Sequence, residues 1–226
     1  MKVLCVADQI DPLVYSNSIK ARFRDVELVL SAGDLPMEYL GFIASSLNKP
    51  IVFVFGNHHL SSMKVFRKDR SSIITGLPND DESSLPPNTY GATYVGGKSL
   101  KIKGLLIAGL GGSMWYNGGP NQYTDFQMFW KVMKLVPRML FNRLVHGRYL
   151  DIFLTHSPPL GIGDKEDRCH TGFKAFRWFL RRFRPRYMIH GHIHLYDLNA
   201  QRKNLYHETQ ILNVYNHLVL EIEKPR

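Results

Sequence analysis

Short runs of apolar, mostly β-branched residues recur along the chain, and each run ends abruptly in small or polar residues. Such runs are typical of buried strands, and the segments between them are long enough to hold crossover helices. The sequence therefore predicts an α/β fold. The strands that this pattern predicts cover residues 3–7, 26–30, 51–55, 105–108, 152–154 and 187–189.

The remaining segments show other patterns. Residues 123–146 have helical spacing with a break or kink expected near Pro137, and residues 173–183 predict a second helix. The tail from residue 210 to 223 alternates enough to supply closing strands. Residues 61–87 are rich in Ser, Asp, Asn and Pro, which predicts a surface excursion. We expect a single domain over residues 1–226, because the chain has no fixed repeat and 44% apolar residues can build one sizeable core.

Charge and cysteine content narrow the functional classes. The chain carries 29 Lys and Arg against 19 Asp and Glu, a formal charge of +10. This balance favours phosphorylated substrates, polyanions or anionic membrane surfaces as partners. Two cysteines cannot build a disulfide framework or a four-cysteine zinc site, which favours a reducing compartment. With no leader pattern and no run of about 18 apolar residues, we expect a cytoplasmic protein, soluble or peripheral to the membrane.

Polar residues that suit metal binding follow the predicted strands. Asp34 comes 26 positions after Asp8, and Asn57 comes 23 positions after Asp34, so each spacing fits one βα unit. Because the carboxyl ends of such strands converge at one crevice, these side chains can meet His156, His192 and His194 from later strand ends. Oxygen and imidazole ligands together suit Mn, Fe or Zn, and a shared carboxylate can bridge two ions about 3.5–4 Å apart.

The order of these residues resembles the signature of the calcineurin-like metallophosphoesterases. The matching motifs are Gly33-Asp34, Gly56-Asn57-His58, Thr155-His156 and Gly191-His192-Ile193-His194. The resemblance implies a four-layer α/β/β/α fold, in which two mixed β-sheets packed as a sandwich are flanked by helices. It also implies a centre of two divalent metal ions. By position, Asp8 and His194 would bind the first ion, Asp34 would bridge, and Asn57, His156 and His192 would bind the second.

Two cations suit the hydrolysis of phosphate esters for a physical reason. They neutralise the anionic phosphate oxygens and lower the pKa of a bridging water, which gives a metal-bridged hydroxide near neutral pH. The leaving alkoxide needs a proton, and the resemblance places His58 near it as the catalytic residue. An imidazole has a pKa near 6.5 when unperturbed, which suits that role.

Two positions depart from the family pattern. The first motif is usually Asp-x-His, and here Ile10 stands where the histidine is expected, so the first metal site should be the weaker one. Asp11 could compensate, although Pro12 restricts its backbone. His59 stands where an acidic residue usually follows the third motif. A carboxylate that would orient a neighbouring histidine is therefore absent.

The glycine-rich segment from Gly109 to Gly112 and the residues after it have two interpretations. Closely spaced glycines could cradle a phosphate, or the segment could be a mobile loop. Because it follows a predicted strand, we expect it to form a wall of the substrate site. Trp115, Tyr116 and Asn117 would then contact the substrate.

Both predicted helices carry basic stripes. In the helix over residues 173–183, Lys174, Arg177, Arg181 and Arg184 share a face that either binds a polyanion or is simply solvated. The helix over residues 126–141 has more apolar residues than one core face needs, beside the basic residues Lys131, Lys134 and Arg138. That pattern is typical of an interfacial helix, a dimer contact or a helix buried against the sheet.

Two functional hypotheses follow. The first is a metal-dependent hydrolase, a phosphatase, phosphodiesterase or pyrophosphatase with manganese as one candidate metal. Its substrate would be a phosphorylated small molecule, a nucleotide or a lipid-linked pyrophosphate. The second is a weakly active or non-catalytic protein of the same fold that binds nucleic acid or an anionic membrane surface. The departure at Ile10 favours the second, and the retained polar ligands favour the first, because a scaffold has no need to bury them.

Overall fold

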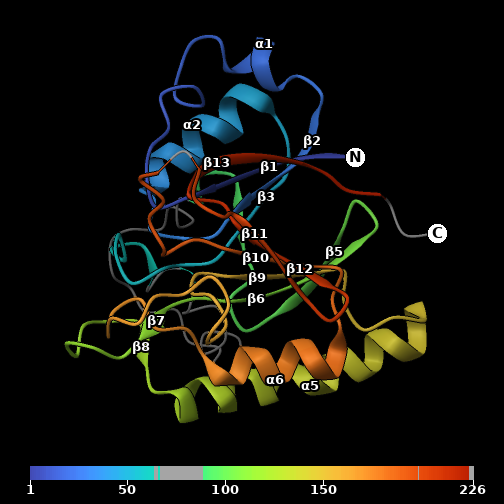
Figure 1. Cartoon of the computed structure of the whole chain (residues 1–226). Coiled ribbons are helices and arrows are strands. Elements are labelled where there is room, and N and C mark those ends of the chain that lie inside the picture. Colours follow the sequence, from blue (N-terminus) through green and yellow to red (C-terminus); the bar gives the residue numbers. More distant parts are fainter. Residues whose placement is uncertain (64–65, 67–88, 198, 224–226) are drawn as a thin grey trace, which may run out of the picture.

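The computed structural model of the chain describes residues 1–63, 66, 89–197 and 199–223. The predicted surface excursion over residues 61–87 lies outside the described residues, except at 61–63 and 66. Two large sheets pack face to face with helices on both outer sides (Figure 1). The predicted sandwich of two mixed sheets in four layers is therefore confirmed.

The two sheets contain all but two of the described strands. The first sheet has the order β13 (Asn216–Glu221), β1 (Lys2–Ala7), β2 (Val26–Ser31), β3 (Ile51–Phe53) and β4 (Ala92–Tyr94). The second has the order β11 (Lys203–Tyr206), β12 (Thr209–Asn213), β10 (Tyr187–His190), β9 (Ile152–Thr155), β6 (Leu105–Leu110) and β5 (Ser99–Ile102). Strands β1 to β4 run parallel, as do β12, β10, β9 and β6, so the carboxyl ends of these strands lie together within each sheet.

Strand β1 shows how the sequence makes the layers. Val3, Cys5 and Ala7 belong to the apolar cluster between the two sheets. Leu4 and Val6 belong to the cluster beneath α1 (Ile19–Phe23) and α2 (Met37–Leu47). Successive side chains of a strand point to opposite faces, so an uninterrupted apolar run is what a strand covered on both faces requires.

Helices α5 (Asp125–His146) and α6 (Lys174–Phe183) cover the outer face of the second sheet. A capping box between Thr124 and Gln127 begins α5, and Gly147 ends it in the left-handed conformation. Of the break or kink predicted near Pro137, the break is wrong, because the helix continues through that residue to His146. Among the described residues, no helix has the length and apolar content that crossing a membrane requires.

Several strand boundaries differ from the predicted ones. β3 ends at Phe53 instead of residue 55, and β6 continues to Leu110, so Gly109 lies inside a strand. Between β6 and α5 in the chain, β7 (Ser113–Met114) and β8 (Gln122–Tyr123) form a short parallel pair. The closing strands expected in the tail are confirmed as β12 and β13.

Candidate metal centre

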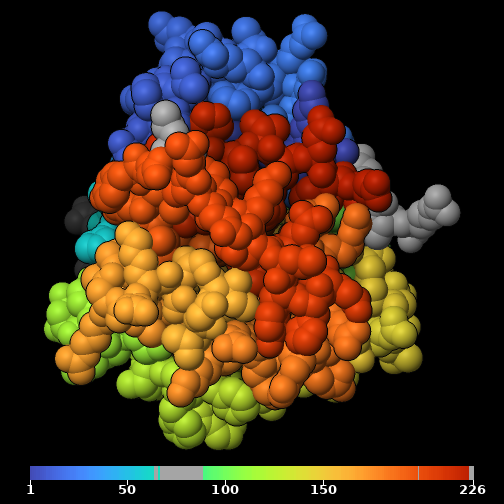
Figure 2. Space-filling model, in the orientation of Figure 1, coloured from blue at the N-terminus to red at the C-terminus, as the bar shows by residue number. Residues whose placement is uncertain are grey.

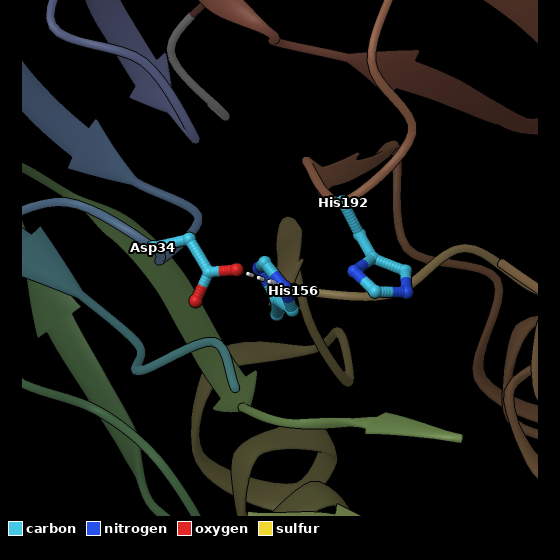
Figure 3. Close-up of side chains that lie close together, drawn as sticks. All are labelled: Asp34, His156 and His192. Carbon is cyan, nitrogen blue, oxygen red and sulfur yellow. Dashed lines mark ion pairs between the residues drawn. The ribbon is translucent and has the colours of Figure 1, made fainter. Parts of the chain in front are cut away.

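Five polar side chains from the two sheets meet where their strands end. Asp8, Asp34 and Asn57 follow β1, β2 and β3 of the first sheet, while His156 and His192 follow β9 and β10 of the second. In Figure 3, Asp34 and His192 approach His156 from opposite sides. The sandwich thus brings together side chains from opposite halves of the sequence, as the pattern of strand ends predicts.

His156 is the centre of the group. Its Nδ1 lies 2.8 Å from the carbonyl oxygen of Ala32, which can only accept, so Nδ1 carries a proton. Its Nε2 lies 3.3 Å from Oδ2 of Asp34 and 3.2 Å from Oδ1 of Asn57. Three electron-rich atoms therefore face one another in a buried site, which is the arrangement that a cation stabilises.

His192 is held in the same way. Its Nε2 lies 2.6 Å from the carbonyl oxygen of Cys169, which fixes the proton on Nε2 and leaves Nδ1 free as a ligand atom. Asp34, His156 and His192 each offer one ligand atom, and these atoms all lie within 4.8 Å of one another. With Asn57 these residues supply two imidazoles, a carboxylate and an amide oxygen, a donor set that fits Mn, Fe or Zn.

The electrostatics of the group also fit a cation. Burial would lower the pKa of His156, but Asp34 and Asp8 outweigh it and raise that pKa above its ordinary value. Burial opposes ionisation of Asp34, yet His156 and the backbone N–H of His58 hold its pKa well below its usual range. The negative potential that favours a proton on a buried imidazole favours a divalent ion at the same place.

Three residues predicted as metal ligands have strained backbones. Asp8, Asp34 and His192 have φ angles of 67°, 56° and 68°, in the left-handed region that side chains other than glycine seldom adopt. Strain of this kind costs about 1–3 kcal/mol per residue and persists where the surrounding structure enforces it. Its concentration on predicted ligands supports a functional role for this corner of the fold.

The residues predicted for the first metal are less well arranged. The side chain of Asp8 is fully buried, and both its oxygens accept a hydrogen bond from the backbone N–H of His192 at 2.9 and 3.0 Å. Burial raises the pKa of Asp8 to about 7. His194 hydrogen-bonds Tyr196 and stacks on Tyr215. Among the described residues, neither Asp8 nor His194 joins the close cluster that contains Asp34.

Asp11 has partners outside the close cluster in this structure. Its Oδ1 accepts the backbone N–H of Leu13 at 2.8 Å, and its Oδ2 lies 2.6 Å from Nδ1 of His217. Both oxygens are therefore engaged away from the cluster. Ile10 is 41% exposed and offers no ligand atom. These contacts do not favour Asp11 as a replacement for the missing imidazole, and its compensating role stays a prediction that metal titration can test.

We expect metal titration of the protein to show two unequal steps, because Ile10 leaves the first site short of a ligand. Asp11→Asn should leave both steps unchanged while lowering the midpoint of thermal unfolding, since it removes the carboxylate that hydrogen-bonds His217, at a cost of about 1–3 kcal/mol. Ile10→His should tighten the weaker step. Isothermal titration with Mn²⁺ measures the affinity of each binding step. A loss of affinity at either step in Asp11→Asn would show that Asp11 binds metal.

The segment between β6 and β8 lies against the candidate centre. The amide of Asn57 donates to the hydroxyl of Tyr116 at 3.4 Å, which places Tyr116 beside a predicted ligand. Trp115 is 47% exposed at the same rim. Asn117 instead accepts hydrogen bonds from Gly119 and Gln122 within its own loop, so it is engaged in shaping the loop.

Two glycines of this segment use their N–H groups within the fold. The N–H of Gly109 donates to the carbonyl of Lys98, and the N–H of Gly112 donates to the carbonyl of Phe55. These donors are therefore used in holding the sheets and loops together. Gly109 and Gly112 therefore do not support the cradle interpretation, and the role of this segment as a wall beside Asn57 remains a prediction.

His170 lies beside the candidate centre although it belongs to none of the sequence motifs. Its ring centroid lies 5.4 Å from that of His192, and its Nδ1 lies 2.7 and 2.9 Å from the two carboxylate oxygens of Asp167. The same loop supplies the Cys169 carbonyl that orients His192. The available signal was the Asp-x-x-His spacing of Asp167 and His170 in the loop between β9 and α6. His58 is exposed at the rim of the centre, with its backbone N–H donating to Oδ1 of Asp34 at 2.7 Å.

Comparison with known proteins agrees with this geometry. The sequence profile of the calcineurin-like phosphoesterases matches residues 1–196, which include every motif of the candidate centre. The chain belongs to the calcineurin-like phosphoesterase family. Proteins of this family typically bind divalent metal ions and act on phosphorylated substrates.

Solved structures of low sequence identity share the fold of this chain. One crystal structure superposes with a TM-score of 0.63 at 14% identity, over 97% of this chain and 94% of the other. That of TT1561 from Thermus thermophilus gives a TM-score of 0.60 at 12% identity, over 95% of this chain and 89% of the other. At these identities the likeness shows the fold alone.

Proposed function

We propose that this protein is a metal-dependent hydrolase of phosphate esters. The observation that carries the proposal is the convergence of His156 Nε2, Asp34 Oδ2 and Asn57 Oδ1 in a buried site with negative potential. A cluster of this kind is costly to bury unless a cation is bound there. Bound divalent ions would neutralise the charge of the phosphate oxygens. They would also lower the pKa of a bound water, so that hydroxide is available to attack phosphorus.

The chain's own residues have distinct tasks in this proposal. Ala32 and Cys169 hold the two histidine ligands through their backbone carbonyls, so the ligand atoms need little reorganisation. Asp34 shares its carboxylate between the centre and the backbone N–H of His58, which fixes the loop that carries His58. His58 at the rim would donate a proton to the leaving oxygen, and Trp115 and Tyr116 would contact the group attached to the phosphate.

The proposal is tested by metal analysis of protein purified without chelator, followed by assays with Mn²⁺. The substrates are p-nitrophenyl phosphate, bis-p-nitrophenyl phosphate and a nucleoside diphosphate, which separate monoesterase, diesterase and pyrophosphatase activity. We expect bound transition metal and hydrolysis of at least one substrate. Absence of both metal and turnover would contradict the proposal.

His58→Ala is expected to keep its metal and to lose about hundredfold in rate on alkyl phosphates, which leave poorly without a proton. The loss should be much smaller with p-nitrophenyl esters, because their leaving group is stable as an anion. His59→Asn is the matched control, since His59 is the adjacent exposed histidine with φ of 51°, which asparagine tolerates. An equal loss on good and poor leaving groups would argue against proton donation by His58.

The alternative function is a weakly active or non-catalytic protein of the same fold. The observation that favours it is the incomplete first site, where Ile10 is exposed and Asp11 is bound to His217. The two functions differ in one measurement. Ile10→His should raise turnover if the protein is a hydrolase whose first site lacks a ligand, and it should give no turnover if the protein is non-catalytic and serves only to bind.

A further inference from the structure

The outward face of α5 is apolar along the whole helix. Four residues of α5, Met128, Val132, Leu135 and Met139, are fully buried against the second sheet. With 3.6 residues per turn, the positions on the opposite side of the helix point away from the sheet. We call these positions the outer stripe, and they are Phe126, Trp130, Met133, Pro137, Leu140, Phe141 and Leu144.

The outer stripe is exposed. Leu144 is 85% exposed, Phe126 is 70%, Trp130 is 55%, and Leu140 and Phe141 are about half exposed. A surface helix normally carries polar residues on this side. Burial against the sandwich therefore does not explain the excess of apolar residues in this segment, and a contiguous exposed apolar surface of this kind marks an interaction site.

Basic residues border the outer stripe. Lys134 and Arg138 lie along one side of α5, whose only acidic residue is Asp125, whereas Lys131 is half-buried with its Nζ 4.1 Å from the ring centroid of Tyr123. Helix α6 packs beside α5 through Phe129 and Trp178, whose ring centroids are 5.5 Å apart, and it has no acidic residue. Figure 2 shows the lime start of α5 at the lower edge of the molecule, with orange α6 beside it.

The exposed side of α6 is basic and borders a surface groove. Lys174, Arg177 and Arg181 are exposed and line a groove of about 320 Å³ with Leu160, Trp178 and Tyr206. Among the residues that the structure describes, none of these three basic side chains forms an ion pair. The groove thus combines apolar walls with positive charge that no carboxylate of the described residues pairs, although Arg177 lies over the ring of Tyr206 at 5.6 Å.

We propose that α5 and α6 together bind the protein to an anionic phospholipid surface. The outer stripe would enter the boundary between headgroups and acyl chains, and the basic residues of both helices would contact lipid phosphates. Charge argues against a second copy of this chain as the occupant, because it would bring two basic surfaces together. A nucleic acid would use the basic residues and leave the apolar stripe exposed to water.

The segment that precedes α5 connects this surface to the candidate centre. The chain passes from Tyr116, beside Asn57, through β8 directly into the first turn of α5. Figure 1 shows β7 and β8 next to that end of the helix. Lipid binding would therefore place the loop of Trp115 and Tyr116 near the membrane surface.

The test is flotation with vesicles of phosphatidylcholine alone and of phosphatidylcholine with about 30% phosphatidylglycerol. We expect the wild type to bind the anionic vesicles and to lose binding at high salt. The double variant Phe126→Ser/Leu144→Ser should bind at least about tenfold more weakly, and so should Arg177→Glu/Arg181→Glu. The matched control is Leu205→Ser, which removes a 71% exposed leucine from β11 and should bind as the wild type does.

Stability, activity and oligomeric state of the same variants show which results would contradict the proposal. Thermal unfolding and turnover of a soluble phosphate ester should not change in Phe126→Ser/Leu144→Ser, because both side chains are exposed. Failure of the wild type to bind anionic vesicles would overturn the proposal. So would a wild-type dimer in sedimentation equilibrium that this double variant dissociates, or binding to an RNA fragment but not to vesicles.

Discussion

Asp34→Asn is expected to abolish hydrolysis of phosphate esters, with a loss of at least about 10³-fold in turnover, and to reduce bound metal. Asparagine has nearly the same shape as aspartate, and its oxygen can still accept the backbone N–H of His58. The substitution therefore removes the negative charge that faces His156 and leaves the loop in place. Turnover with saturating Mn²⁺ and metal content by elemental analysis measure the effect.

Asp151→Asn is the matched control for this prediction. Asp151 is also buried, and its carboxylate accepts the backbone N–H of Leu106 at 2.7 Å and pairs with Arg148. Its loss should lower the stability of the fold without changing metal content. If Asp34→Asn keeps wild-type turnover, or if both variants lose metal equally, the assignment of Asp34 to the centre is wrong.

The part of the site that follows strand ends could be predicted from the sequence. Parallel strands end at one edge, so a polar residue directly after each apolar run must lie near that edge, as Asp34, Asn57 and His156 do. The choice of partner for a side chain depends on its rotamer and on distant segments. That is why the pairing of Asp11 with His217 and the closeness of His170 to His192 could not be predicted.

Helix α5 shows a second limit of sequence reasoning. The spacing of its apolar residues predicts a helix. Because two opposite faces of this helix are apolar, the sequence does not indicate which of these faces packs against the sheet. The structure identifies the face of Met128 and Val132 as buried and that of Phe126 and Leu144 as exposed. Pro137 predicts a break or a kink, and the structure has no break there. Pro137 lies on the exposed face, where the helix continues despite the hydrogen bond that proline cannot make.

Gly56→Ala is the prediction with the next largest effect, because this glycine lets Asp34 and His156 approach the loop of Asn57. A Cβ atom at position 56 would overlap the Oδ1 atom of Asp34 and would lie 2.6 Å from Cε1 of His156. The alanine therefore displaces two predicted ligands at once. We expect weaker metal binding and at least about 10³-fold lower turnover, since even small misplacement of a reacting group costs about 10²-fold.

Gly104→Ala is the control, because a Cβ there meets open space and its φ of 85° alone costs about 1 kcal/mol of stability. The decisive measurement is a double-mutant cycle of turnover with Gly56→Ala and Asp34→Asn. If both act on the same carboxylate, the combined variant loses little more than Asp34→Asn alone. Additive losses would mean that Gly56 acts elsewhere, and a folded Gly56→Ala variant with normal metal content would show that this close approach does not matter to the centre.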